Sequence, residues 1–272
     1  MPTRIHRISK RQRFLGEHPY CCFCGGSAPA TTSDHVPPRA CFPDGFSPEG
    51  FEFPACDNCN RGTKRDDQIF GFYAMLLDFS EANRSKSHTE KLSKLRQGIA
   101  NNYPEALPDV LSARPVCTFG SVVTPSPIAI ATSTPAAFRE AAASIGQKLT
   151  HALYYRERGT ALSSQHQFTT GCYQIQNSAT TTLTECFAKL LPDPTIGFRS
   201  NVKQYGERFA YKSGVKEKDD FFVYAAQFGK GLIIWGIVLG PTMAVSAVGE
   251  PLRSMHWRNG AITSAYPVDS RL

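Results

Sequence analysis

The sequence lacks any apolar segment long enough to place it in a membrane. Its longest apolar stretch, Gly231 to Gly240, is about half of the ~20 residues that a membrane-spanning helix needs. The N-terminal residues contain no apolar core of the kind found in a secretory signal. We therefore expect a cytoplasmic protein with no membrane partner.

A strong excess of charge of one sign is also missing. Lys and Arg total 30 against 23 Asp and Glu, a net charge of +7, which is compatible with a nucleic-acid partner but does not establish one. The exception is an arm at residues 1–17, which has no acidic residue before Glu17. It carries the basic residues Arg4, Arg7, Lys10, Arg11 and Arg13. Such an arm can lie along a phosphate backbone, or it can be a solvated, disordered terminus.

Cysteine is plentiful, and four of the nine cysteines are paired in sequence. Cys21/Cys24 and Cys56/Cys59 each have the two-residue gap that lets two sulfurs turn onto one Zn²⁺ ion. Cys22 could in principle supply a thiolate of the first pair, but only Cys21 has the two-residue gap to Cys24. The five cysteines outside this pattern, Cys22, Cys41, Cys117, Cys172 and Cys186, are expected to be buried or incidental thiols in a reducing compartment.

The loop between the two cysteine pairs is longer than in a plain zinc ribbon, so we expect it to contain additional structure. Asp34 and His35 lie side by side in this loop, and Asn60 is joined directly to Cys59. Asp and Asn offer oxygen ligands that suit Mg²⁺ or Mn²⁺ sharing its shell with water and phosphate. His35 is then free to act as a base, and a zinc ion on Cys59 would fix where Asn60 points.

These residues resemble the HNH endonucleases of the ββα-metal fold, particularly the four-cysteine members. The match consists of Cys21-x-x-Cys24, Asp34-His35-Val36-x-Pro38 and Cys56-x-x-Cys59-Asn60, and it covers roughly residues 18–80. The resemblance implies a metal-dependent endonuclease that hydrolyses phosphodiester bonds, with DNA as the expected substrate. It implies that His35 is the general base, that Asp34 and Asn60 hold a catalytic Mg²⁺ or Mn²⁺, and that the four cysteines hold a structural zinc.

Two departures from the family pattern lie close to the site. The family usually has an Asn or His shortly before the second cysteine pair, where this chain has Glu52, which could substitute as a brace for the loop. The family's lysine falls three residues after the asparagine, whereas Lys64 falls four after Asn60. The basic residues considered for contact with substrate phosphates are Arg39, Arg61, Lys64 and Arg65.

The predicted fold class is α+β. Residues 1–17 form the basic arm, 18–110 a zinc-stapled ββα-metal module with a helical extension, and 111–272 a second α+β domain with an antiparallel sheet. Helical spacing continues from Asp57 to about Phe79 and recurs over Ala136–Arg158, where Gly159 can cap the end. Further expected elements are a helix at Thr182–Leu191 and strands at Phe168–Gln176, Arg208–Lys212, Asp220–Gln227 and Leu232–Leu239.

The sequence of the second domain contains no motif with the residue spacing of a metal site, no phosphate-binding loop and no nucleophile motif. It could select the target, or bind a protein partner or a second copy of the chain. Two alternatives to the nuclease stay open: a zinc-knuckle module that binds nucleic acid or protein and whose hydrolytic site has lapsed, and an enzyme whose active site lies in the second domain. Dependence of the activity on a divalent ion distinguishes the first alternative from the nuclease.

Overall fold

The computed structural model describes residues 9–45, 47–78, 85–108, 114–115, 129–130, 135–174, 197–198, 203–205, 208–216, 220–244 and 258–259. Helices and antiparallel strands are mixed along this part of the chain, which confirms the predicted α+β class. The largest sheet of the described residues has seven strands in the order β11-β5-β10-β9-β8-β6, with β7 also paired to β8. Its strands are β5 (Gln167–Gln174), β6 (Gly197–Phe198), β7 (Lys203–Tyr205), β8 (Phe209–Lys216), β9 (Phe221–Phe228), β10 (Leu232–Leu239) and β11 (Arg258–Asn259).

The predicted antiparallel meander is confirmed in β8, β9 and β10, which pair in sequence order. β10 also pairs with β5, so the earliest long strand of this sheet lies beside the last one of the meander. The strand predicted at Arg208–Lys212 is longer than expected, because β8 continues to Lys216. The helix predicted at Thr182–Leu191 lies outside the described residues.

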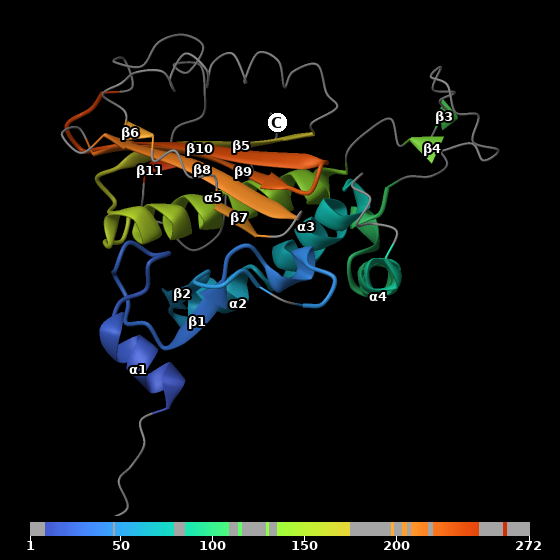
Figure 1. Ribbon diagram of the computed structural model, residues 1–272, viewed down its shortest axis with the longest axis horizontal. Coiled ribbons are helices and arrows are strands. Elements are labelled where there is room, and N and C mark those ends of the chain that lie inside the picture. Colours follow the sequence, from blue (N-terminus) through green and yellow to red (C-terminus); the bar gives the residue numbers. More distant parts are fainter. Residues whose placement is uncertain are drawn as a thin grey trace, which may run out of the picture.

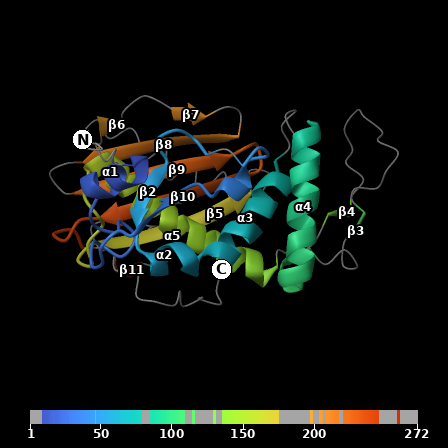
Figure 2. The ribbon, with the colours of Figure 1, turned by 90° about the horizontal axis from the view of Figure 1, so that it is seen from below.

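Helix α5 (Ala136–Arg158) has the predicted bounds and ends at Gly159, which adopts the left-handed conformation with φ 72°. It lies between the seven-stranded sheet and the N-terminal hairpin (Figures 1 and 2). Thr150 faces the sheet, with its hydroxyl 3.1 Å from Tyr224 Oη, while His151 Nδ1 lies 3.3 Å from the Cys22 carbonyl on the hairpin side. A helix covered on two sides must be apolar almost all round, and α5 is buried over most of its length.

The close approach of α5 to the sheet depends on Gly146. A Cβ at this position would lie only 2.6 Å from Thr170 Oγ1 of β5. A side chain at position 146 would therefore require the Thr170 side chain or the helix itself to move.

The N-terminal half begins with helix α1 (Lys10–Glu17), whose capping box joins Ser9 and Gln12. The disordered alternative for the arm therefore fails for this part of it. The elements that follow are β1 (Thr32–His35), η1 (Arg39–Cys41), β2 (Glu52–Ala55), α2 (Asp57–Gly62), α3 (Lys64–Leu76), α4 (Lys86–Asn102), η3 (Pro104–Ala106), β3 (Arg114–Pro115) and β4 (Ala129–Ile130). The single helix predicted from Asp57 is two helices, because the chain leaves the helical conformation at Thr63.

The core is continuous between the two halves of the chain. Phe51, from the loop before β2, is fully buried and makes edge-on contacts with Phe209 and Tyr211 of β8. The buried apolar residues form one cluster that extends from Cys21 to Val238. The domain division near residue 110 stays a prediction from the sequence. No helix of the described residues has the length and apolar character that crossing a membrane requires.

His151 generates a prediction about stability. Its side chain is fully buried, and this burial lowers its pKa to about 4. The folded state holds the neutral imidazole, so its stability is fully present above the ordinary histidine pKa. The free energy of unfolding then decreases as pH falls from about 6.5 towards 4. Leucine does not titrate, so we expect the free energy of unfolding of His151→Leu to fall less than that of the parent over this pH range, by up to about 3 kcal/mol.

Urea unfolding of the parent and His151→Leu between about pH 7 and pH 4.5, with zinc content recorded at each pH, measures the difference. His18→Ala is the control, because His18 is only partly buried and hydrogen-bonds the Tyr155 hydroxyl, which is also only partly buried. Parallel pH dependences for the parent and His151→Leu would contradict the prediction.

Candidate metal centre and active site

The two cysteine pairs meet in space. The sulfur atoms of Cys21, Cys24, Cys56 and Cys59 all lie within 4.8 Å of one another. Tetrahedral zinc with Zn–S bonds of ~2.3 Å needs sulfurs about 3.8 Å apart, so a small contraction closes the group around one ion. The four thiols therefore form a group that could hold a metal ion such as zinc. Cys22 is not part of it, which settles the choice left open by the sequence.

Local backbone structure turns each pair towards the centre. After Cys24 the chain reverses through Gly25 and Gly26, which have φ of 66° and 80°, values that residues with a Cβ rarely adopt. Cys56 is the N-cap of α2, and its sulfur accepts a hydrogen bond from the Cys59 amide at 3.5 Å. A hydrogen bond from Cys59 is the main reason that the pKa of Cys21 falls to about 5, and the same contact raises the pKa of Cys59.

The residues between the pairs form a β-hairpin followed by a helix. β1 and β2 pair antiparallel, with Asp34 opposite Phe53 and His35 opposite Glu52, and α2 begins directly after β2. Glu52 accepts a hydrogen bond from the Ser33 hydroxyl of β1. Glu52 therefore joins the two strands of the hairpin through a side-chain hydrogen bond.

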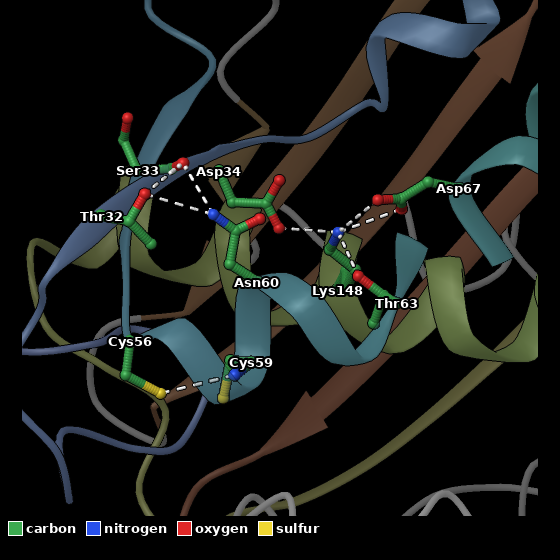
Figure 3. A network of polar contacts seen from close by, with 9 residues as sticks. All are labelled: Thr32, Ser33, Asp34, Cys56, Cys59, Asn60, Thr63, Asp67 and Lys148. Atoms are coloured by element: carbon green, nitrogen blue, oxygen red, sulfur yellow. Dashed lines mark hydrogen bonds and ion pairs between the residues drawn. The ribbon is translucent and has the colours of Figure 1, made fainter. Parts of the chain in front are cut away.

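Asn60 lies on α2 against β1. Its amide nitrogen donates to Thr32 Oγ1 at 3.3 Å and to the Ser33 carbonyl at 3.2 Å. Two oxygen acceptors at one end of the amide identify that end as the nitrogen. Figure 3 shows the other end, the Asn60 oxygen, on the side of Asp34.

Asp34 is buried, with 8% of its surface exposed, and its Oδ2 lies 2.7 Å from the ammonium nitrogen of Lys148 on α5. This contact was not anticipated from the sequence. Lys148 is 1% exposed and also reaches Thr63 and Asp67, at the start of α3 (Figure 3). The one available signal was the position of Lys148 within the apolar face of a predicted helix, since a lysine there needs a buried anionic partner.

His35 lies on the other side of β1 from Asp34, because successive side chains of a strand point to opposite faces. Its Nε2 is 2.9 Å from the Arg39 guanidinium. Arg39 can only donate, so Nε2 is the acceptor and the imidazole is neutral with its proton on Nδ1. Burial, and next the charge of Arg39, lower the pKa of His35. His35 is therefore held in the form that can accept a proton.

The other basic residues differ in how far they are available to a phosphate. Arg39, Arg61 and Lys64 are exposed, although Arg61 lies 3.8 Å from the Asp57 carboxylate in an equally exposed pair. Arg65 points to three carboxylates, those of Glu105 at 3.1 Å and of Asp66 and Glu140 at 3.5 Å. Contact between Arg65 and a substrate would therefore have to break existing ion pairs.

The oxygen donors fit a hard divalent ion. Lys148 contacts Oδ2 of Asp34 and leaves Oδ1 as the atom that an ion could bind, while the hydrogen bonds of Asn60 leave its oxygen available. One carboxylate and one amide oxygen are the ligands that Mg²⁺ or Mn²⁺ takes when water and phosphate complete its shell. Comparisons of the chain with protein-family models, curated proteins and solved structures give no match.

The cysteine cluster predicts the metal content of the protein. Protein purified without added metal should contain about one zinc ion per chain, and Cys59→Ala should lose it. Structural zinc contributes ~10–16 kcal/mol in small modules, comparable with the ~5–15 kcal/mol stability of a whole domain. We therefore expect Cys59→Ala to unfold the hairpin and α2.

Cys22→Ala is the matched control, because Cys22 is adjacent to the cluster and fully buried but does not belong to it. It should keep its zinc. Metal analysis and thermal unfolding of both variants make the comparison, and a zinc-free parent with an intact fold would refute the assignment.

Proposed function

We propose that the chain is a metal-dependent endonuclease of the HNH type, acting on phosphodiester bonds with DNA as the expected substrate. The observation that carries the proposal is that a hairpin and helix, joined through the four-cysteine group, bring Asp34 and Asn60 to one side of β1, with His35 next to Asp34 along the strand. A zinc knuckle with only a structural role needs none of these three side chains. The net charge of +7 and the exposed Arg39, Arg61 and Lys64 suit a polyanionic substrate.

The catalytic ion would be held by Oδ1 of Asp34 and the side-chain oxygen of Asn60. When bound, Mg²⁺ or Mn²⁺ supplies charge stabilisation for the phosphorane-like transition state and for the departing oxygen. Asn60 is positioned for this task by its two hydrogen bonds to β1, and Cys59, the preceding residue, ties it to the zinc cluster. Asp34 is positioned by Lys148.

His35 would take the proton from the attacking water. Its Nε2 lone pair faces Arg39 in the free protein, so the base becomes available when Arg39 moves to another partner. A substrate phosphate is such a partner, because guanidinium binds phosphate through paired, charge-assisted hydrogen bonds. Arg39 is exposed and begins a short η1 helix, which gives it room to move.

The alternative is a module that binds nucleic acid or protein through the zinc-stapled hairpin and no longer cleaves. The burial of Asp34 and its ion pair with Lys148 favour it, because a carboxylate that is 8% exposed and already paired with an ammonium is poorly accessible to an ion. Retention of His35 in its neutral, proton-accepting form favours the enzyme.

The main test is His35→Ala. Removing a general base should lower the rate of phosphodiester cleavage by roughly 10²–10⁴. Zinc content and melting temperature should stay close to the parent values, since His35 contacts neither the cysteine cluster nor Lys148. His18→Ala, which removes an imidazole from outside the site, is the control and should cleave at the parent rate. Equal rates for His35→Ala and the parent would exclude His35 as the base.

Chelation distinguishes the two candidate functions. With EDTA present at a concentration that leaves the zinc in place, the nuclease should stop cleaving circular DNA and recover when Mg²⁺ or Mn²⁺ is added. A binding module should show no cleavage under either condition, with an affinity for DNA that falls as salt is raised. Cleavage that is unaffected by EDTA would reject the divalent-ion mechanism.

A further inference from the structure

The least expected feature of the site is a buried lysine among oxygen atoms. The Lys148 ammonium has four oxygens around it: Asp34 Oδ2 at 2.7 Å, Thr63 Oγ1 at 2.8 Å, and Asp67 Oδ1 and Oδ2 at 3.1 and 3.4 Å. They come from β1, from the break between α2 and α3, and from the first turn of α3, while the lysine comes from α5. We call this set the oxygen cage.

The composition of the oxygen cage is that of a cation site. Carboxylate and hydroxyl oxygens converging from three elements are what proteins use to bind hard metal ions. The Thr63 side chain precedes α3 but makes no capping bond to it, and instead faces Lys148. The cage is thus organised around the cation at its centre.

The ammonium is charged in the folded protein. Its Nζ lies 2.7 Å from a carboxylate oxygen of Asp34 and 3.1 and 3.4 Å from those of Asp67, the distances of ion pairs. Asp67 keeps a raised pKa of about 6, mainly through burial. The two carboxylates share this one ammonium, so its removal would leave both without a cationic partner.

We propose that Lys148 acts as a built-in cation that fills the oxygen cage, keeps a metal ion out of it, and leaves to the catalytic divalent ion Oδ1 of Asp34 and the side-chain oxygen of Asn60. Lys148 is in this sense a positioning and selectivity residue. Its role in the reaction rests on the proposed nuclease function, whereas its occupation of a cation cage does not.

Lys148→Ala tests the proposal. Truncation opens the space of the ammonium and leaves the two carboxylates and the Thr63 hydroxyl facing it. We expect Lys148→Ala to bind one more Mn²⁺ ion per chain than the parent, measured by Mn²⁺ titration with EPR detection in the absence of DNA. The four-cysteine cluster is monitored separately by zinc analysis.

Two matched variants make the result specific. Lys148→Met fills the same space without charge or donors, so it should show no additional ion. Lys148→Ala combined with Asp67→Asn removes a carboxylate of the cage and should lose the additional ion. A folded Lys148→Ala that binds no more Mn²⁺ than the parent, or whose extra ion survives Asp67→Asn, would overturn the proposal.

Lys148→Ala also leaves buried carboxylates without their partner, which can unfold a protein. In that event the readout is refolding, because an ion that binds only the folded cage stabilises it. Recovery of the fold and of its melting transition in Mn²⁺ supports the proposal, and failure to refold in Mn²⁺ overturns it.

The same titration separates this proposal from the nuclease assignment. Loss of parent Mn²⁺ binding in both Asp34→Ala and Asn60→Ala identifies the catalytic ion. A parent that binds no Mn²⁺ and cleaves nothing, alongside a Lys148→Ala variant that binds an Asp67-dependent ion, would reject the nuclease and retain the oxygen cage. A parent that cleaves DNA, alongside a Lys148→Ala variant that binds no additional ion, would retain the nuclease and reject the proposal for the oxygen cage.

Discussion

The arrangement of this protein depends on the ion pairs of one buried ammonium group. An unpaired buried charge is strongly unfavourable, and removing one partner of a buried pair typically destabilises a protein by about 3–5 kcal/mol. The fold must therefore bring Asp34 and Asp67 to Lys148 at the same time as the apolar contacts form. This requirement fixes α5 against both the hairpin and α3, and it accounts for the burial of a charged side chain in the middle of α5, beside the buried polar residues Gln147, Thr150 and His151.

Two independent anchors hold the hairpin in place. The cysteine cluster fixes the segment before β1 and the start of α2, and Lys148 fixes Asp34 at the other end of β1. Asn60 lies between these anchors and is hydrogen-bonded to the strand itself. Side chains held on both sides in this way lose little freedom on binding a ligand, which is the condition for a pre-organised site.

Much of this arrangement could be predicted from local sequence patterns. The spacing of the two Cys-x-x-Cys pairs predicts that the four cysteines come together. Helical spacing predicts α5, and Gly159 predicts where it ends. The break at Thr63 was missed although Gly62 and Thr63 are poor helix formers, because the broad apolar face of α3 was extended back to Asp57. The Thr63 hydroxyl contacts Lys148 and makes no capping bond to α3.

The contacts across the oxygen cage could not be predicted in the same way. Lys148 and Asp34 are separated by more than a hundred positions, and no local pattern joins them. An apolar helix face with a lysine in it signals a buried anion somewhere, but many carboxylates could satisfy it. Only the packing of α5 against both the sheet and the hairpin selects Asp34 and Asp67, and that packing depends on details such as the close approach at Gly146.

The alternation of side chains along β1 restricts where the chemistry can occur. Asp34 faces α5 and His35 faces the opposite side. Under the proposed nuclease function, a base and an ion ligand would have to serve the same phosphate, and the place for it would be past the end of β1, where the strand gives way to the loop that carries Arg39. A phosphate in that position would contact Arg39 first and would draw it from His35 as it approached the ion. The half of the chain that contributes α5 is therefore more than a recognition domain in this scheme, because without Lys148 the carboxylate on the inner face of β1 would have no fixed direction.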